Sequence, residues 1–319
     1  MQQRQLGRSG ISISAVIMGT WQTGKAMWVG IEDAQSEAAV RAALDAGITT
    51  FDTAEAYGNG HSERILGRAL AAVRGQVVLA SKVFANHLKH DQVIQACNRS
   101  LKNLGTDTLD LYQIHWPSGS FGSPQVPVAE TMGALNDLKA QGKIRAIGVS
   151  NFSAAQLEEA AQYGRIESLQ PPYSLFWRHL EADAMAYCQA NAITILAYSP
   201  MAQGLLTGKF GPDHQFEKGD HRAKSKLFTP QNFQKVQAAL TALRPIAARK
   251  GVSLGQLALA WVLSHPNTCA IAGARAAEQI SESAAAADVA LSAADLAEMD
   301  RISRIVTEGL DPDPVLWNF

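Results

Sequence analysis

Short apolar runs alternate with amphipathic stretches along almost the whole chain. Runs rich in apolar and β-branched residues, typical of strands that a sheet buries, cover residues 16–20, 48–52, 77–82, 109–115, 144–150, 168–170, 193–198 and 270–273. Stretches with helical periodicity lie between them, at residues 33–46, 62–73, 91–104, 128–141, 153–163 and 180–190. Helices of this length between buried strands are crossover connections, so the pattern predicts a parallel sheet.

Eight strand–helix units predict an α/β protein with a closed (β/α)₈ fold, the TIM barrel. The alternative, a doubly wound sheet, usually carries a GxGxxG turn after its first strand. This chain has Gly19-Thr20-Trp21 at that place instead. A β-hairpin is expected before the barrel, with its strands at residues 3–6 and 11–15.

The connection after the seventh strand is unusually long. Residues 199–230 show no clear periodicity before helices resume at residues 231–249 and 253–263, and a last helix is expected to begin near Arg275. Because long loops inside a domain are usually functional, we expect this one to cover a binding site. No linker or second core interrupts the pattern, so residues 1–319 are predicted to form a single domain.

Composition narrows the classes of function. The 319 residues carry 28 Lys and Arg against 29 Asp and Glu, so the net charge of −1 gives no field that would gather nucleic acid or anionic lipid. Three widely separated cysteines support neither a disulfide framework nor a zinc knuckle. No signal peptide or membrane-spanning run is visible. We therefore expect a cytoplasmic protein, monomeric or weakly homo-oligomeric, without a nucleic-acid or membrane partner.

Ionisable side chains stand at the carboxyl ends of three successive predicted strands. Asp52, Lys82 and His115 each close an apolar run, and Tyr57 lies in the loop after Asp52. Active sites of TIM barrels lie at this end of the strands, so we expect the four residues to meet in one site. A single charged residue at a strand end is often only a solvated cap, but the joint occurrence of these four side chains at this spacing is hard to explain by a structural role alone.

These four side chains form a set suited to proton transfer. The ordinary pKa of tyrosine is about 10, and a neighbouring ammonium lowers it by stabilising the phenolate. Lys82 is the expected ammonium, and Asp52 would keep it charged beside an apolar pocket. His115 would orient a substrate oxygen through a hydrogen bond. The pattern thus predicts Tyr57 as a catalytic acid.

The segments around these residues resemble the aldo-keto reductase family. FDTAEAYGNGHSE, with Asp52 and Tyr57, is similar to the family signature after the second strand, ASKV to the segment of the catalytic lysine, and YQIHWP to that of the catalytic histidine. IGVSNFS, LQPPYSLFWR, LAYSPMAQGLLTGK and GARAAEQI resemble its cofactor-binding segments. The chain is most similar to the bacterial branch with a longer seventh loop, which is related to the potassium-channel β subunits.

The resemblance implies reversible reduction of aldehydes or ketones with NADPH, which the family binds in an extended form without a Rossmann domain. It implies that Ser150, Asn151 and Gln170 hold the nicotinamide carboxamide and that Tyr198 stacks on the ring. Asn151 is available for this role because Ser153 and a glutamine three residues later are expected to cap the following helix.

The resemblance also implies where the phosphates bind. Gly204 would let the backbone approach the pyrophosphate and Leu205 would cover it, while Arg275 would pair with the 2′-phosphate and favour NADPH over NADH. Ala272 and Ser283, near the expected adenine site, depart from the residues that many relatives carry. The implied cofactor-binding residues are Gly19, Thr20, Trp21, Ser150, Asn151, Gln170, Tyr198, Ser199, Pro200, Met201, Gly204, Leu205, Lys209, Arg222, Gly273, Arg275, Gln279 and Ser283.

Aromatic side chains after the strand ends predict an apolar substrate pocket that suits aldehydes better than highly charged compounds, and a sugar, a pyridoxal-like aldehyde and a lipid-derived aldehyde all fit this description. They are Trp21, Trp28, Tyr57, Phe84, Trp116 and Phe121.

Other functions fit the sequence less well. A regulatory or scaffolding subunit that binds the cofactor and acts through a partner is the main alternative. A zinc-dependent hydrolase lacks its ligand cluster, since His87 and His90 are better explained as a solvated helix start, so no metal is expected. The basic residues Arg222, Lys224 and Lys226 are interpreted as phosphate neighbours rather than an RNA site, because no aromatic residues are interleaved with them at a stacking spacing.

Overall fold

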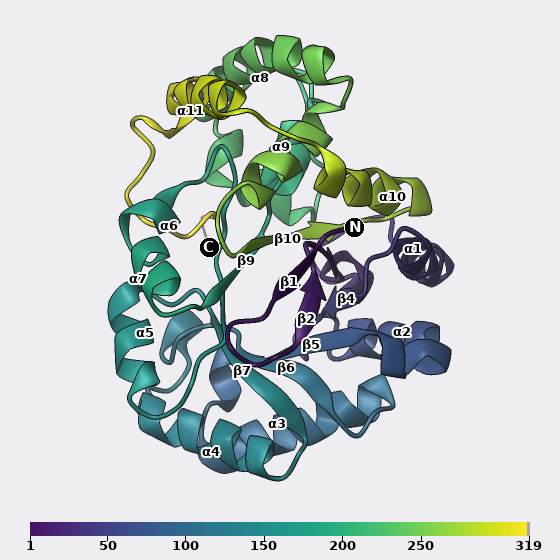
Figure 1. The fold of residues 1–319 in the computed structure, drawn as a ribbon, viewed down its shortest axis with the longest axis vertical. Coiled ribbons are helices and arrows are strands. Elements are labelled where there is room, and N and C mark those ends of the chain that lie inside the picture. The colour runs from purple at the N-terminus through teal and green to yellow at the C-terminus, as the bar shows by residue number, and fades with distance from the viewer. Residues whose placement is uncertain (318–319) are drawn as a thin grey trace.

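The computed structural model describes residues 1–317, and a closed barrel of eight parallel strands forms its centre (Figure 1). The strands are β3 Val16–Gly19, β4 Thr50–Asp52, β5 Val78–Val83, β6 Leu109–Ile114, β7 Ile144–Ser150, β8 Ser168–Gln170, β9 Thr194–Tyr198 and β10 Thr268–Gly273. Each pairs with its neighbour in chain order, and β10 closes the ring by pairing Ala270 with Val16 of β3. The predicted (β/α)₈ fold is therefore confirmed, with small shifts at the strand ends.

The predicted hairpin covers the amino-terminal end of the barrel. β1 (Gln3–Gln5) pairs antiparallel with β2 (Ser12–Ser14), and Figure 1 shows the two lying across the barrel opening. Leu6 and Ile13 are buried against side chains that point into the barrel, including Ile17 and Leu111. This apolar plug closes one end of the barrel and leaves the other end for a site.

Helices surround the barrel, and each of them buries apolar side chains. They are α1 Asp33–Asp45, α2 His61–Leu70, α3 His90–Leu104, α4 Val128–Ala140, α5 Ala154–Ala161, α6 His179–Ala182, α7 Met185–Ala190, α8 Pro230–Lys250, α9 Leu254–Leu263, α10 Ala277–Ala285 and α11 Ala293–Thr307. The predicted cap of α5 is present, because Ser153 Oγ accepts the backbone N–H of Gln156 and the glutamine side chain accepts that of Ser153.

The structure differs from the sequence prediction in three places. The stretch predicted as one helix at residues 180–190 is divided into α6 and α7. The long connection after β9 contains three short 3₁₀ helices, Ala202–Thr207, His221–Lys224 and Lys226–Phe228. α10 is not the last helix, because α11 follows and packs on α8, where Asp295 forms an ion pair with Lys250 at 2.6 Å. Because α11 does not follow a strand, the alternation of strands and helices does not predict it.

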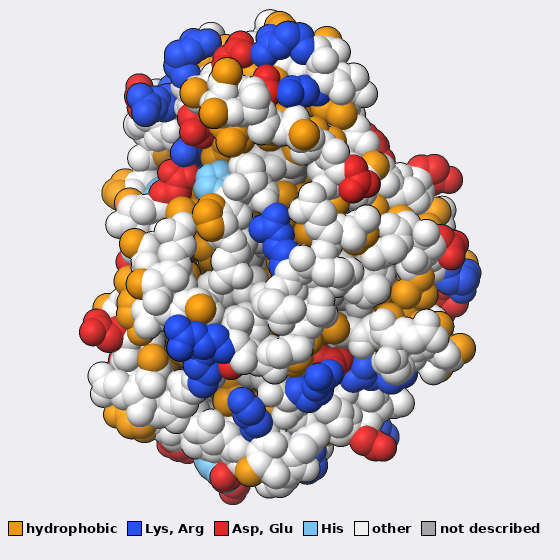
Figure 2. Space-filling model, viewed as in Figure 1, with side chains coloured by type: hydrophobic (Ala, Val, Ile, Leu, Met, Phe, Trp, Pro, Cys, Tyr) orange, Lys and Arg blue, Asp and Glu red, His pale blue; other side chains and the backbone are white. Residues whose placement is uncertain are grey.

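The surface shows no extended region of one charge on the face that the hairpin covers. Figure 2 shows acidic and basic side chains of this face scattered among neutral ones. Within residues 1–317 there is no helix that combines the length and the apolar character of a membrane span. The three cysteines are buried free thiols, and no group of three or more potential metal ligands occurs in this part of the chain.

We expect Leu6→Ala to lower the free energy of unfolding by roughly 2–5 kcal/mol, because the deleted atoms leave a cavity between hairpin and barrel. Urea unfolding followed by tryptophan fluorescence measures the change. Gln5→Ala, at an exposed neighbouring position, is the control and should stay within about 0.5 kcal/mol of the wild type. Equal, small effects of both substitutions would show that the hairpin does not act as a plug.

Candidate active site

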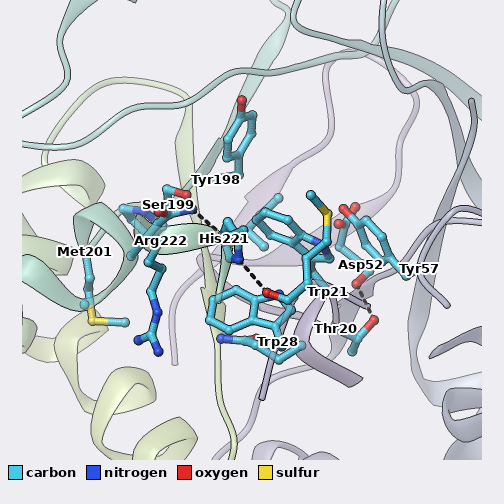
Figure 3. Close-up of a pocket in the computed structure, with 18 of the residues that line it drawn as sticks. Thr20, Trp21, Trp28, Asp52, Tyr57, Tyr198, Ser199, Met201, His221 and Arg222 are labelled. Carbon is cyan, nitrogen blue, oxygen red and sulfur yellow. Dashed lines mark hydrogen bonds between the residues drawn. The ribbon is translucent and has the colours of Figure 1, made fainter. Parts of the chain in front are cut away.

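A cavity of about 770 Å³ opens at the carboxyl-terminal end of the barrel strands. Figure 3 shows Thr20, Asp52 and Tyr57 on one side of it and Met201 and Arg222 on the other. The predicted site residues that line it are Gly19, Thr20, Trp21, Trp28, Asp52, Tyr57, Phe84, His115, Trp116, Phe121, Ser150, Asn151, Gln170, Tyr198, Ser199, Pro200, Met201, Gly204, Lys209, Arg222, Gly273, Arg275, Gln279 and Ser283.

Lys82 lies beneath the cavity floor and joins two other predicted catalytic residues. Its Nζ donates hydrogen bonds to Asp52 Oδ1 at 2.5 Å and to the Thr53 carbonyl oxygen at 2.8 Å, and lies 3.3 Å from Tyr57 Oη. The two charged residues meet because β4 and β5 are neighbouring parallel strands, whose carboxyl ends lie side by side. The lysine side chain is completely buried.

Asp52 receives further hydrogen bonds inside the barrel. Its Oδ2 accepts the side-chain amides of Gln170 at 3.0 Å and Gln113 at 3.3 Å. The carboxylate is therefore surrounded by donors, as a buried charge requires. Gln170, which the resemblance assigned to the nicotinamide carboxamide, contacts the Asp52 carboxylate in this structure.

Burial and charge act in opposite directions on the central pair. Burial raises the pKa of Tyr57 above its ordinary value, and the charge of Lys82 offsets this only in part. Lys82 does act to lower the Tyr57 pKa, as expected, but desolvation of the phenolate is the larger effect, so the net shift is upward. Burial acts to lower the pKa of Lys82, but Asp52 and Tyr57 raise it above its ordinary value. At neutral pH the site holds a protonated phenol beside an ammonium.

His115 lies at the cavity wall between two aromatic rings. The ring centroids of Tyr57 and Phe84 are 5.6 and 5.5 Å from its imidazole, both edge-on. Burial, together with the charge of Lys82, keeps the pKa of His115 well below its ordinary value, so the imidazole is neutral. A neutral imidazole can donate one hydrogen bond to a substrate oxygen without adding charge.

Asn151 and its neighbours form a hydrogen-bonded wall after β7. Asn151 has a left-handed backbone, with φ of 62°, and its amide donates to the carbonyl oxygen of His115 at 3.0 Å. Its Oδ1 accepts the hydroxyl of Tyr198 at 2.9 Å, and Ser150 Oγ donates to the Gln170 carbonyl oxygen at 2.7 Å. These bonds fix the side chains that the resemblance placed around a nicotinamide.

The loop after β9 begins with a strained backbone. Ser199, Ala202 and Gln203 have positive φ values of 51°, 48° and 56°, and Gly204 has 94°. Non-glycine residues adopt this conformation at a cost in free energy, and such strained residues cluster at functional sites. Leu205, expected to cover the pyrophosphate, is instead 1% exposed and packs in the core, because the 3₁₀ turn directs it inward.

Cationic side chains gather at one part of the cavity. The guanidinium carbons of Arg275 and Arg222 lie 5.2 and 5.3 Å from the ring of Trp28, and Asp220 pairs with Arg222. Burial lowers the pKa of Lys209, and the two arginines lower it further. Arg275 Nη2 is buried without a hydrogen-bond partner. This concentration of positive charge suits an anionic ligand.

Two further predicted residues have contacts that the sequence did not suggest. Trp28, assigned to the substrate pocket, lines the cavity and also contacts the two arginines and His221, with 4.5 Å between its ring and the imidazole. Lys226, interpreted as a phosphate neighbour, does not line the cavity. It is buried and forms an ion pair with Asp313 at 2.8 Å. Lys224 does line the cavity.

The structure adds residues that the sequence did not suggest. The His221 imidazole lies 4.4 Å from the ring of Trp21, and its Nδ1 is 2.9 Å from the Met27 carbonyl oxygen. Trp317 is parallel to Tyr198, with 6.1 Å between the rings. His221 comes from the long loop predicted after the seventh strand, and Trp317 comes from a segment for which the sequence predicted no element. The other unforeseen lining residues are Gln22, Met27, Ala56, Gln203, Thr207, Ser253, Gly255, Gln256, Leu259, Ile271 and Glu282.

A (β/α)₈ barrel that gathers an aspartate, a tyrosine, a lysine and a histidine at its open end, here Asp52, Tyr57, Lys82 and His115, defines a class of oxidoreductase that acts on carbonyl and alcohol groups. The family model described as the aldo/keto reductase family matches residues 15–304, and the chain belongs to this family.

Curated relatives include enzymes and channel subunits. The chain is 39% identical to an aldo-keto reductase of Bacillus subtilis, over 88% of this chain and 87% of the relative. It is 35% identical to an NADH-specific methylglyoxal reductase of Escherichia coli, over 92% of this chain and 96% of the relative. It is 33% identical to a probable voltage-gated potassium channel subunit β of Oryza sativa, over 91% of this chain and 92% of the relative. The predicted relationship to both groups is thus confirmed.

Solved structures agree with this assignment. A glycerol dehydrogenase of Gluconobacter oxydans has a TM-score of 0.88 and 34% identity, with 97% of each chain covered. An aldo/keto reductase of Klebsiella pneumoniae in complex with NADP and acetate has a TM-score of 0.72 and 33% identity, with 92% of each covered.

We expect Lys82→Met to destabilise the fold by about 3–5 kcal/mol, because it leaves the Asp52 carboxylate buried without its counter-ion. Adding Asp52→Asn should recover part of the loss. Since the folded pKa of Lys82 is raised, the contribution of its ammonium should be constant from pH 7 to about pH 10 and fall above that. Urea unfolding of the single and double variants between pH 7 and 11 measures this. A double variant no more stable than the single one would contradict the account.

Proposed function

We propose that this protein reduces aldehydes and ketones to alcohols with NADPH as the hydride source, and that Tyr57 is the proton donor. The observation that carries the proposal is the 3.3 Å contact between Tyr57 Oη and the buried Lys82 Nζ at the floor of the cavity. A protonated phenol supported by a permanent ammonium is suited to give a proton to a developing alkoxide and to hold the charge that remains.

Each of the four side chains has a defined task in this reaction. NADPH, when bound, supplies a hydride for the carbonyl carbon. Tyr57 donates its hydroxyl proton to the carbonyl oxygen, and Lys82 stabilises the phenolate. Asp52 holds Lys82 in its charged form. The neutral His115 orients the substrate oxygen through a hydrogen bond. In alcohol oxidation the Tyr57 phenolate takes the proton back.

The cationic part of the cavity supports NADPH as the cofactor. Arg275, Arg222 and Lys209 place three positive charges there. Of these, Arg222 forms an ion pair with Asp220. The buried Nη2 of Arg275 has a free donor position, which a phosphate oxygen would fill. The left-handed residues after β9 form a turn of the loop where the pyrophosphate is proposed to bind. The relative crystallised with NADP fits this assignment, whereas the NADH-specific relative shows that the family varies.

The substrate part of the cavity supports an uncharged carbonyl compound with an apolar body. Phe121 is stacked on Phe84 with 5.7 Å between the rings, and Trp116 meets Phe121 edge-on at 5.0 Å. These three rings line the cavity beside His115. Aromatic walls exclude water and favour apolar groups, so the proposed substrates are small or aromatic aldehydes and ketones.

The similarity to potassium-channel β subunits favours a second candidate function, a cofactor-binding regulatory or scaffolding subunit. Steady-state oxidation of NADPH with a panel of aldehydes and ketones separates the two. Turnover supports the enzyme, whereas tight cofactor binding without turnover of any substrate supports the subunit.

A cytoplasmic location and a monomeric or weakly oligomeric state are further proposals from the sequence.

We expect Tyr57→Phe to keep the fold and the cofactor affinity, since only a hydroxyl group is lost, and to lower kcat by about 10²–10⁴-fold, the typical contribution of general acid catalysis. Single-turnover reduction of a benzaldehyde isolates the chemical step. Phe84→Leu is a matched control that changes the pocket wall without touching the proton donor. If the tyrosine variant kept more than about a tenth of the wild-type rate, another group would be the acid.

Arg275→Ala should weaken NADPH binding and leave NADH binding nearly unchanged, because only NADPH carries the 2′-phosphate. Hydrogen bonds to charged groups contribute about 1.5–3 kcal/mol, which corresponds to roughly a 10- to 150-fold loss of preference. Quenching of tryptophan fluorescence measures both dissociation constants. An equal loss for the two cofactors would mean that Arg275 supports the loop through its contact with Trp28 instead.

A further inference from the structure

We propose that Glu55 is a positioning residue that holds the loop of the proton donor against the strand and loop that carry Lys82 and Phe84. This inference rests on the proposed function. We call Glu55 and the three groups bound to its carboxylate, the Phe84 amide, His87 and Arg99, the Glu55 clamp. None of these contacts was expected from the sequence, where Glu55 is only one residue of the motif around Tyr57.

The carboxylate of Glu55 is held by three donors from the next strand–helix unit. Its Oε1 accepts the backbone N–H of Phe84 at 3.0 Å and lies 2.9 Å from His87 Nδ1. Its Oε2 accepts Arg99 Nη2 at 2.9 Å. The Glu55 side chain is only 9% exposed, whereas that of Arg99 is 49% exposed. The inner part of the clamp is therefore shielded from water, and a lost hydrogen bond there is not replaced freely by solvent.

The backbone of Glu55 reinforces the same connection. Its N–H donates to the carbonyl oxygen of Lys82 at 3.4 Å, and its own carbonyl oxygen accepts the N–H of Gly60 at 2.9 Å. Glu55 thus bonds to both residues 82 and 84 on one side and closes the turn that contains Tyr57 on the other. Since Tyr57 follows two residues later, the position of its ring relative to Lys82 depends on this attachment.

The clamp also sets the surroundings of His115. The rings of Tyr57 and Phe84 both meet the imidazole edge-on, at 5.6 and 5.5 Å, and the clamp fixes the backbones of both rings. A displacement of either loop would change the angle between the proton donor, the imidazole and a substrate oxygen. Catalysis is sensitive to such shifts, since a misplacement of about 1 Å can cost about 10²-fold in rate.

The chain offers a comparison pair without this geometry. Glu37 accepts Arg68 at 2.9 Å between α1 and α2, with side chains 27% and 57% exposed. Neither residue lines the cavity, and Glu37 makes this ion pair without a bond to a catalytic loop. Glu37→Ala therefore removes a carboxylate from an interhelical contact and should leave the kinetics unchanged.

The test compares Glu55→Ala, Glu55→Gln, Arg99→Ala and Glu37→Ala in the full-length protein. We expect Glu55→Ala to lower kcat for benzaldehyde by about tenfold or more, with the KM for NADPH within twofold of the wild type. Glu55→Gln should restore most of the activity, because its amide oxygen can still accept the Phe84 N–H. Arg99→Ala, which removes only the exposed partner, should change kcat by less than about threefold.

Hydrogen–deuterium exchange of a peptide spanning residues 81–88, which contains the Phe84 amide, gives a readout that does not require activity. The Phe84 amide should exchange faster in Glu55→Ala than in the wild type and in Glu37→Ala. Unchanged exchange, or a kcat within twofold of the wild type, would overturn the positioning role. An equal loss of kcat in Glu37→Ala would also overturn it, by showing a general effect on stability. A wild-type protein that reduces no carbonyl would instead overturn the proposed function, and the exchange rates would still decide whether the clamp exists.

Discussion

The buried ion pair of Lys82 and Asp52 is the interaction on which the rest of the site depends. Two charges removed from water are costly unless their remaining hydrogen-bonding positions are filled. The barrel fills them with the Thr53 carbonyl oxygen on the ammonium and two glutamine amides on the carboxylate. These donors and acceptors come from β6, β8 and the end of β4, so the pair is satisfied only when the barrel is closed. The chemistry of Tyr57 is thereby tied to the global fold.

The cavity separates two chemical environments. Aromatic rings surround the neutral His115, where an uncharged carbonyl compound would meet the proton donor. Arginine and lysine side chains gather elsewhere along the same cavity, where an anionic cofactor would be held. Trp28 belongs to both parts, because its indole contacts Trp21 on one side and the guanidinium groups on the other.

Segments far apart in the chain complete the cavity. His221, from the long loop after β9, contacts the loop after β3 through the Met27 carbonyl oxygen. Trp317 reaches the cavity because the chain end is bound to that same long loop, where the Lys226 amide donates to the Leu316 carbonyl oxygen at 3.0 Å. The ion pair of Lys226 with Asp313 strengthens this attachment. The lysine thus supports the chain end instead of a phosphate.

The sequence by itself determined the parts that follow a local or repeating rule. Strand and helix alternation predicted the barrel, because each unit buries its apolar side in the same way. The positions of Asp52, Lys82 and His115 at strand ends predicted their meeting, because parallel strands bring all carboxyl ends to one face. The capping pair at Ser153 was equally predictable, since it needs only residues three apart.

Only the tertiary structure decided the contacts that no periodicity encodes. The direction of the Tyr57 pKa shift depends on how much water the folded site excludes, which residue spacing does not give. Leu205 turns inward and Trp317 enters the cavity because of how irregular segments pack on a finished barrel. The bonds of Glu55 to the neighbouring loop arise in the same way. Such contacts join residues whose separation along the chain carries no signal, so their partners become evident only when the strands are placed side by side.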